Sequence, residues 1–206
     1  KALKRCLKLA PNHIEALTRI GWAYIESRNY SPAIAVLQRA SKVEPDSPTI
    51  WNALAAALNG SGSLDQAVEA ARKAHVLAPK SLLIGQNYAL VLLDAGQVSL
   101  ARTTLESLHP HIIDAEGVSA KQQNTYKGLL ARVIAADVIV RRLCASKKPG
   151  LQAHQRAIRD ALSRLELKRD RKTINRLAAS IMPQAKTALA RCKKTALDKT
   201  KPRATP

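Results

Sequence analysis

The sequence has few of the residues that β-sheets, disulfide frameworks and membrane spans require. Its 206 residues include two Trp, four Tyr and no Phe, so aromatic residues make up only 3%. Cys6, Cys144 and Cys192 are widely spaced and form no CxxC pair, which indicates neither a disulfide framework nor a zinc site. The longest apolar stretch is interrupted at Asp137 and ends at Arg141, well short of the ~20 apolar residues of a membrane span. Helix-favouring Ala, Leu, Lys, Arg and Gln are abundant, so the composition predicts an all-α protein.

Positive charge is concentrated in the second half of the chain. Residues 1–110 contain 12 Lys and Arg against 8 Asp and Glu, whereas residues 111–206 contain 22 against 7. The net charge of the whole chain is +19. Such a basic region is typical of proteins that bind an acidic partner, namely nucleic acid, an anionic membrane surface or an acidic protein. A solvated basic face without a partner is the alternative.

The first half contains an internal repeat with an interval of 34 residues. Pro11, Pro45 and Pro79 have this spacing. Other positions of one chemical class with the same interval are Ala33, Ala67 and Ala101, Leu9, Val43 and Leu77, and Gly21, Ala55 and Ala89. Apolar residues within each unit recur at intervals of three and four, which predicts two amphipathic helices per unit.

Local signals place the ends of these helices. Asn12 with Glu15 three residues later predicts a capping box, and Ser31 and Ser47 each precede a proline as candidate N-caps.

Gly62 and Gly96 lie between the two helices of units two and three, where a positive φ is convenient. Arg28 occupies this place in unit one, and we expect it to carry local strain there.

This pattern resembles that of the tetratricopeptide repeat (TPR) family. Unit one supplies the family pattern at Leu17, Ile20, Gly21, Tyr24, Ala33, Leu37, Ala40 and Pro45, and unit two at Trp51, Leu54, Ala55, Leu58, Ala67, Ala71, Ala74 and Pro79. The resemblance covers residues 1–108 and implies a helix-turn-helix solenoid. We expect a solenoid over residues 1–110, with a half repeat at 1–11 and repeats at about 12–45, 46–79 and 80–108. Because the chain starts within a repeat, we expect further residues upstream of Lys1 in the natural protein.

Residues 111–198 are predicted to form a basic α-helical region outside the resemblance. Periodic apolar residues predict helices at about 120–146, 151–165 and 174–196, the last kinked at Pro183. These helices could cap the open end of the solenoid. The polar residues 199–206 are predicted to be disordered. The sequence leaves the compartment open, and the lack of a visible signal peptide favours the cytoplasm.

The resemblance implies a concave groove lined by the first helix of each unit. The residues that map to it are Glu15, Thr18, Trp22, Ile25, Glu26, Asn52, Asn59, Gln86 and Leu90. Trp22 is either a ligand anchor or packed against a neighbouring helix. Asn52 and Asn59 could bond a peptide backbone. Positions matching the carboxylate clamp of co-chaperone TPR modules hold Thr18, Trp22, Ala53, Leu83 and Asn87 and no cation, which argues against binding of a chaperone tail.

No catalytic motif or phosphate-binding loop is present, so we predict a non-enzymatic protein without a cofactor. His109 and His111 could form a metal pair, but a plain loop is the simpler interpretation. Cys144 and Cys192 could be reactive thiols or buried apolar residues.

The predicted function is therefore that of a scaffold or adaptor that binds a peptide or helix of another protein in the groove. The alternative is polyanion binding, to RNA, DNA or an anionic membrane, through Arg169, Lys172, Arg176, Lys186 and Lys194.

Overall fold

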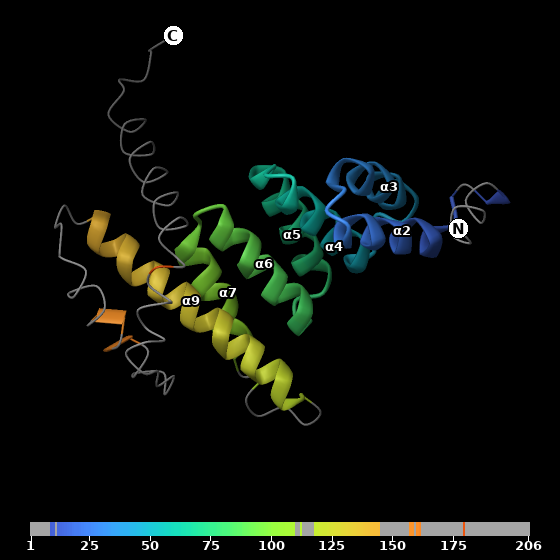
Figure 1. Cartoon of the computed structure of the whole chain (residues 1–206). Coiled ribbons are helices and arrows are strands. Elements are labelled where there is room, and N and C mark those ends of the chain that lie inside the picture. The colour runs from blue at the N-terminus through green and yellow to red at the C-terminus, as the bar shows by residue number, and fades with distance from the viewer. Residues whose placement is uncertain are drawn as a thin grey trace, which may run out of the picture. The chain divides into compact units, whose positions relative to one another are not determined.

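The computed structural model describes residues 9–10, 12–109, 112, 118–144, 157–158, 160–161 and 179. These residues form seven helices and no strand (Figure 1), which confirms the predicted all-α class. The helices are α2 (Ile14–Glu26), α3 (Tyr30–Val43), α4 (Pro48–Gly60), α5 (Leu64–Leu77), α6 (Leu82–Asp94), α7 (Val98–Leu108) and α9 (Ala120–Cys144). The chain divides into two compact units, Lys1–Val91 and Leu92–Pro206, and each is described by itself. The repeat-based boundary near residue 110 stays a prediction.

In the first unit, small residues allow neighbouring helices to approach closely. Helix α2 packs against α3, and α4 packs against both α3 and α5. Ala33 and Ala67 are 0% exposed. A Cβ at Gly21 would lie 2.6 Å from the Leu37 side chain, so only glycine fits there. The predicted role of the small repeat positions is thus confirmed, because these positions form the closest contacts of a densely packed interior.

The predicted capping box at Asn12 is wrong. Helix α2 is capped instead by His13, whose Nδ1 accepts a hydrogen bond of 3.2 Å from the backbone N–H of Ala16. The Asn12 side chain accepts two hydrogen bonds from Arg39, at 2.9 and 3.2 Å. Glu15 forms an exposed ion pair with Arg19 at 2.8 Å. Asn12 therefore lies one residue too early to cap the helix. Its amide oxygen instead accepts the hydrogen bonds from Arg39 of α3.

The two serine caps have opposite outcomes. Helix α3 begins at Tyr30 with Asn29 at the N-cap, so Ser31 lies inside the first turn and the prediction is wrong. Ser47 is the N-cap of α4 with Pro48 as the first helical residue, as predicted, although the serine side chain makes no cap hydrogen bond.

The turns between paired helices confirm the predicted left-handed positions. Gly62 and Gly96 have φ values of 83° and 74°. Arg28 holds the equivalent place with a φ of 58°. A residue with a Cβ is disfavoured in this conformation by roughly 1–2 kcal/mol, so this turn carries the local strain expected from the sequence.

In the second unit, α9 packs against α7. The sequence predicts a helix over about 120–146, and α9 spans Ala120–Cys144. The Tyr126 hydroxyl donates a 2.9 Å hydrogen bond to the Leu105 carbonyl, and His109 Nδ1 lies 3.2 Å from the same hydroxyl. One buried tyrosine therefore joins α9 to the end of α7.

A buried carboxylate forms a second link between α7 and α9. Asp137 is 1% exposed, and its oxygens accept hydrogen bonds from Arg102 and Arg141 at 3.0 Å each. Arg102 also pairs with Glu106 at 2.7 Å. Because a buried carboxylate is costly without partners, these bonds fix the position of α9 along α7.

Several predictions lie outside the described residues. These include most of the helices predicted over 151–165 and 174–196, the tail 199–206, Cys6, Cys192 and His111. Among the residues that the structure does describe, no helix is both long enough and apolar enough to cross a bilayer. The same residues contain no cluster of three or more His, Cys, Asp or Glu suited to a metal ion.

Candidate peptide-binding groove

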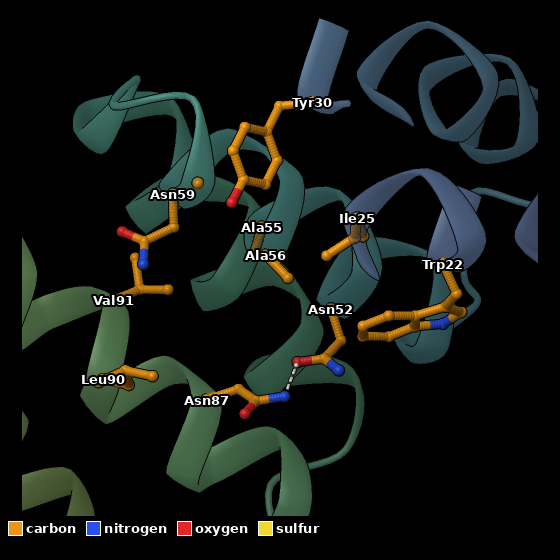
Figure 2. Close-up of a pocket in the computed structure, with 11 residues that line it drawn as sticks. Trp22, Ile25, Tyr30, Asn52, Ala55, Ala56, Asn59, Asn87, Leu90 and Val91 are labelled. Atoms are coloured by element: carbon orange, nitrogen blue, oxygen red, sulfur yellow. Dashed lines mark hydrogen bonds between the residues drawn. The ribbon is translucent and has the colours of Figure 1, made fainter. Parts of the chain in front are cut away.

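A pocket of about 270 Å³ opens on the first unit, among helices α2, α4 and α6. Figure 2 shows side chains from these helices converging on it, with Tyr30 at the start of α3 on one side. Its lining residues are Trp22, Ile25, Tyr30, Asn52, Ala55, Ala56, Asn59, Gly60, Asn87, Leu90 and Val91. The pocket is therefore built mainly by the first helix of each repeat.

The repeat explains why residues so distant in sequence meet here. Trp22, Ala56 and Leu90 follow one another at the interval of 34 residues, as do Ile25 and Asn59. Equivalent positions of stacked repeats lie on the same face of a solenoid. The pocket thus lies along the first helices of three successive repeats, with a large aromatic residue at one end, a small residue in the middle and a leucine at the other.

Two asparagines provide the polar centre of the pocket. Asn87 Nδ2 donates a 3.0 Å hydrogen bond to Asn52 Oδ1, and Asn52 is only 3% exposed (Figure 2). Within the described part of the chain, Asn52 Nδ2 and Asn87 Oδ1 make no hydrogen bond. The pair therefore offers one donor and one acceptor, the two groups that complement a peptide unit.

No charged side chain lines the pocket, although charged residues make up 24% of the chain. The walls are aromatic and aliphatic, and the side-chain polar groups are amides, the Tyr30 hydroxyl and the indole N–H of Trp22. A ligand charge placed here would lose water without gaining an opposite charge. The pocket is thus suited to an uncharged ligand group.

Tyr30 and Gly60 form one wall through an unusually close contact. A Cβ at Gly60 would lie 2.2 Å from Cε1 of the Tyr30 ring. Any other residue at position 60 would push the ring away from its present place. This contact was missed at the sequence level, where the only signal was a glycine at the end of a helix two residues before the turn glycine Gly62.

Five of the nine predicted groove residues line the pocket, and these are Trp22, Ile25, Asn52, Asn59 and Leu90. The other four, Glu15, Thr18, Glu26 and Gln86, do not line it. Thr18 donates to its own helix at Ile14 O, 2.9 Å away. Gln86 precedes Asn87, which takes its place in the pocket. The contribution of each residue to binding stays a prediction.

The residues predicted for polyanion binding lie outside the described part of the chain. These are Arg169, Lys172, Arg176, Lys186 and Lys194. Their role stays a prediction from the sequence.

Comparison with known proteins places the fold. The family model for the tetratricopeptide repeat matches residues 1–57. No curated protein matches the chain. MamA 41-end from Desulfovibrio magneticus RS-1 is 25% identical with a TM-score of 0.50, and the match covers 55% of this chain and 65% of that one.

Two further solved structures share the fold at lower identity. The TPR2B domain of yeast Sti1, solved in complex with pHsp70, is 19% identical with a TM-score of 0.53, covering 58% of this chain and 94% of that domain. YrrB, described as a TPR protein with an unusual peptide-binding site, is 12% identical with a TM-score of 0.57, covering 94% and 98%. The chain therefore contains a tetratricopeptide repeat segment and has the all-α fold of a helical-repeat solenoid.

Proposed function

We propose that this protein is an interaction scaffold, and that its α2/α4/α6 pocket binds an uncharged segment of another protein. The observation that carries this proposal is a pocket with a half-buried tryptophan at one end, a pair of asparagine amides at its centre and no charged side chain in its walls. The Sti1 domain was solved in complex with pHsp70 and YrrB has an unusual peptide-binding site, and both support this class of function.

The ligand is anchored by an apolar side chain against Trp22. Tryptophans that bury a large area at the centre of an interface dominate binding energy. Ile25 and Leu90 extend the apolar surface on either side. A carboxylate-terminated ligand is disfavoured, because the pocket contains no cation to pair with it.

The asparagine pair binds the backbone of the ligand. Asn52 Nδ2 donates to a ligand carbonyl, and Asn87 Oδ1 accepts from a ligand N–H. These bonds are independent of ligand sequence, so they fix the ligand's position while the apolar anchor provides selectivity.

A displayed library of random 12-residue peptides tests this proposal. Enriched peptides should contain an apolar anchor and few charges. Trp22→Ala should weaken their binding, measured by calorimetry, by about 30-fold, the equivalent of about 2 kcal/mol.

Leu83→Ala is the matched control. This side chain is 63% exposed and outside the pocket, so its removal should leave the affinity unchanged. If Trp22→Ala stays folded by circular dichroism and binds as tightly as wild type, the pocket is not the binding site. Failure of the library to enrich any peptide would also contradict the proposal.

The charge of residues 111–206 supports polyanion binding as a second candidate. Replacing Arg176, Lys186 and Lys194 by Gln should weaken binding to a generic single-stranded RNA. The slope of log affinity against log salt is negative, and it should become less steep by about two to three units. The reason is that a variant with fewer phosphate contacts releases fewer counterions when it binds. Absence of RNA binding by the wild type at low salt would eliminate this candidate.

A further inference from the structure

The pocket described above contains a row of three equivalent side chains, one from each of its helices. Trp22 of α2, Ala56 of α4 and Leu90 of α6 are separated by the 34-residue interval and are all partly exposed. Figure 2 shows Ala56 between Trp22 and Leu90. We call these three residues the anchor row. Because the row crosses the helices, a ligand that follows it meets one such position on each helix.

Helix packing sets the distance between neighbouring positions of the anchor row. Helix α2 packs against α4, and a 3.0 Å hydrogen bond joins Asn52 of α4 to Asn87 of α6. The axes of packed helices lie about 8–10 Å apart. A ligand that uses the whole row should therefore present one side chain to it about every 8–10 Å.

Two regular peptide conformations place side chains on one face at this interval. A polyproline II helix has three residues per turn and rises about 3.1 Å per residue, so every third side chain returns to the same face after about 9.3 Å. In an α-helix the interval is seven residues and about 10.5 Å. A β-strand repeats after two residues and only about 6.7 Å, which is too short for the row.

The asparagine pair beside the anchor row distinguishes the two conformations. Among the described residues, Asn52 Nδ2 and Asn87 Oδ1 have no hydrogen-bond partner. A polyproline II segment has no internal hydrogen bonds, so its backbone can pair with both amides. An α-helix uses its backbone groups internally. It would cover the nearly buried Asn52 without replacing the bond that its amide makes to water, which is unfavourable.

The walls of the pocket indicate the composition of the ligand. Trp22 and Tyr30 are aromatic, and no charged side chain from the described residues lines the pocket. Proline-rich segments adopt the polyproline II conformation before they bind, and they occupy aromatic-lined grooves at a low entropic cost. Such a segment needs no opposite charge, so it suits these walls.

We infer that the pocket binds a proline-rich polyproline II segment of a partner protein, with an apolar residue at every third position. The apolar side chains lie on the anchor row. The N–H of the middle apolar residue donates to Asn87 Oδ1, and Asn52 Nδ2 donates to a carbonyl of the segment. This inference rests on the function proposed for the pocket and adds the conformation and composition of the ligand.

Three synthetic peptides of identical composition test the spacing. Each contains three leucines and six prolines, with a leucine at every second, every third or every fourth position. Calorimetry with the full chain should show that the peptide with a leucine at every third position binds at least about tenfold more tightly than the other two. In those two, at least one leucine misses the row and loses its apolar contact. An uncharged stapled α-helix with leucines seven residues apart is the fourth probe, and it should bind more weakly as well.

Ala56→Leu is the variant that tests the path of the ligand. A leucine in the middle of the row should obstruct the segment and weaken binding of the third-position peptide by about tenfold or more. Ala35→Leu is the matched control, because Ala35 is exposed and lies outside the pocket. This variant should bind as the wild type does.

Asn87→Ala tests the backbone hydrogen bond. It should weaken binding of the third-position peptide by about two- to tenfold. It should have no further effect on the same peptide with an N-methylated middle leucine, which lacks the N–H. A merely structural role of Asn87 would weaken both peptides equally and would overturn the assigned bond.

The outcomes separate this inference from the function proposed for the pocket. Equal or tighter binding of the stapled helix, or of either peptide with another spacing, would overturn the inference and leave the pocket as a binding site. The inference also fails if peptides from the random library bind at Trp22 while none of the proline-rich peptides does. If no peptide of either kind binds, both the inference and the proposed function are wrong.

Discussion

The α2/α3 pair and the α7/α9 pair are held together in different ways. Between α2 and α3, packing depends on shape, with Gly21 against Leu37 and Ala33 fully buried. Between α7 and α9, packing depends also on buried polar bonds of Tyr126 and Asp137. Shape packing repeats every 34 residues and is visible in the sequence. Each polar link occurs only once and depends on one particular pair of side chains. The contacts between α2 and α3 are therefore part of the repeat, whereas those between α7 and α9 are not.

The largest effect should come from breaking the Asp137 network. Arg102→Met removes one partner and leaves a buried carboxylate with fewer bonds, which should cost about 3 kcal/mol in the free energy of unfolding. Chemical denaturation measures this. The double variant Arg102→Met with Asp137→Leu should recover part of the loss, because no charge then stays buried.

Arg141→Gln is the control for this network. The Arg141 side chain is 67% exposed, so its loss should cost less than about 1 kcal/mol. An Arg102→Met variant no less stable than Arg141→Gln would show that Asp137 does not link the helices.

The next effect tests the packing by shape. Ala67 is 0% exposed between α4 and α5, so Ala67→Leu should overpack this contact and destabilise by roughly 1–3 kcal/mol. Ala35 lies on the exposed face of α3, and Ala35→Leu should be close to neutral. An unchanged denaturation midpoint for Ala67→Leu would contradict the assigned repeat register.

A smaller effect is expected at Tyr126. Tyr126→Phe deletes the hydrogen bond to the Leu105 carbonyl and keeps the ring, which should cost about 1 kcal/mol. Thr125→Val removes a neighbouring exposed hydroxyl and should stay within about 0.5 kcal/mol. Equal midpoints for the two variants would show that the tyrosine hydroxyl does not stabilise the α7/α9 contact.

The smallest effect concerns pH in the first unit. His75 on α5 stacks against Tyr88 on α6 with ring centroids 5.3 Å apart, and burial lowers the pKa of His75 below its usual 6.5. The unfolded chain therefore binds a proton that the native state resists, so stability should fall as the pH falls below about 6.5.

Urea denaturation at several pH values measures this dependence. His75→Gln should flatten it selectively, because the glutamine does not titrate. A pH dependence identical in wild type and His75→Gln would show that another group causes it.

The 34-residue repeat makes several features of the first 108 residues predictable from the sequence. The buried Ala67, the left-handed Gly62 and Gly96, and the shared face of Trp22 and Leu90 follow from the 34-residue interval. Helix α9 follows from its apolar periodicity alone.

Other contacts could not be predicted from the sequence, because they depend on which of several nearby side chains a residue bonds. His13 caps α2 in place of Asn12 because Arg39 uses the Asn12 oxygen. Asn87 meets Asn52 at a separation of 35 residues, one more than the repeat interval. The Tyr30 contact with Gly60 joins the start of one repeat's second helix to the end of the next repeat's first helix. None of these pairs belongs to the periodic pattern.

Of the two tryptophans of the chain, Trp22 lines the pocket and Trp51 does not, which allows a direct test of the central claim. An uncharged peptide selected on the wild type is titrated into ¹⁵N-labelled protein, and both indole N–H signals are followed. We predict that the Trp22 signal shifts while the Trp51 signal does not, with an affinity that is nearly constant between about 50 and 500 mM salt, since no charges pair. A shift confined to Trp51, or binding that falls steeply with salt, would contradict the account.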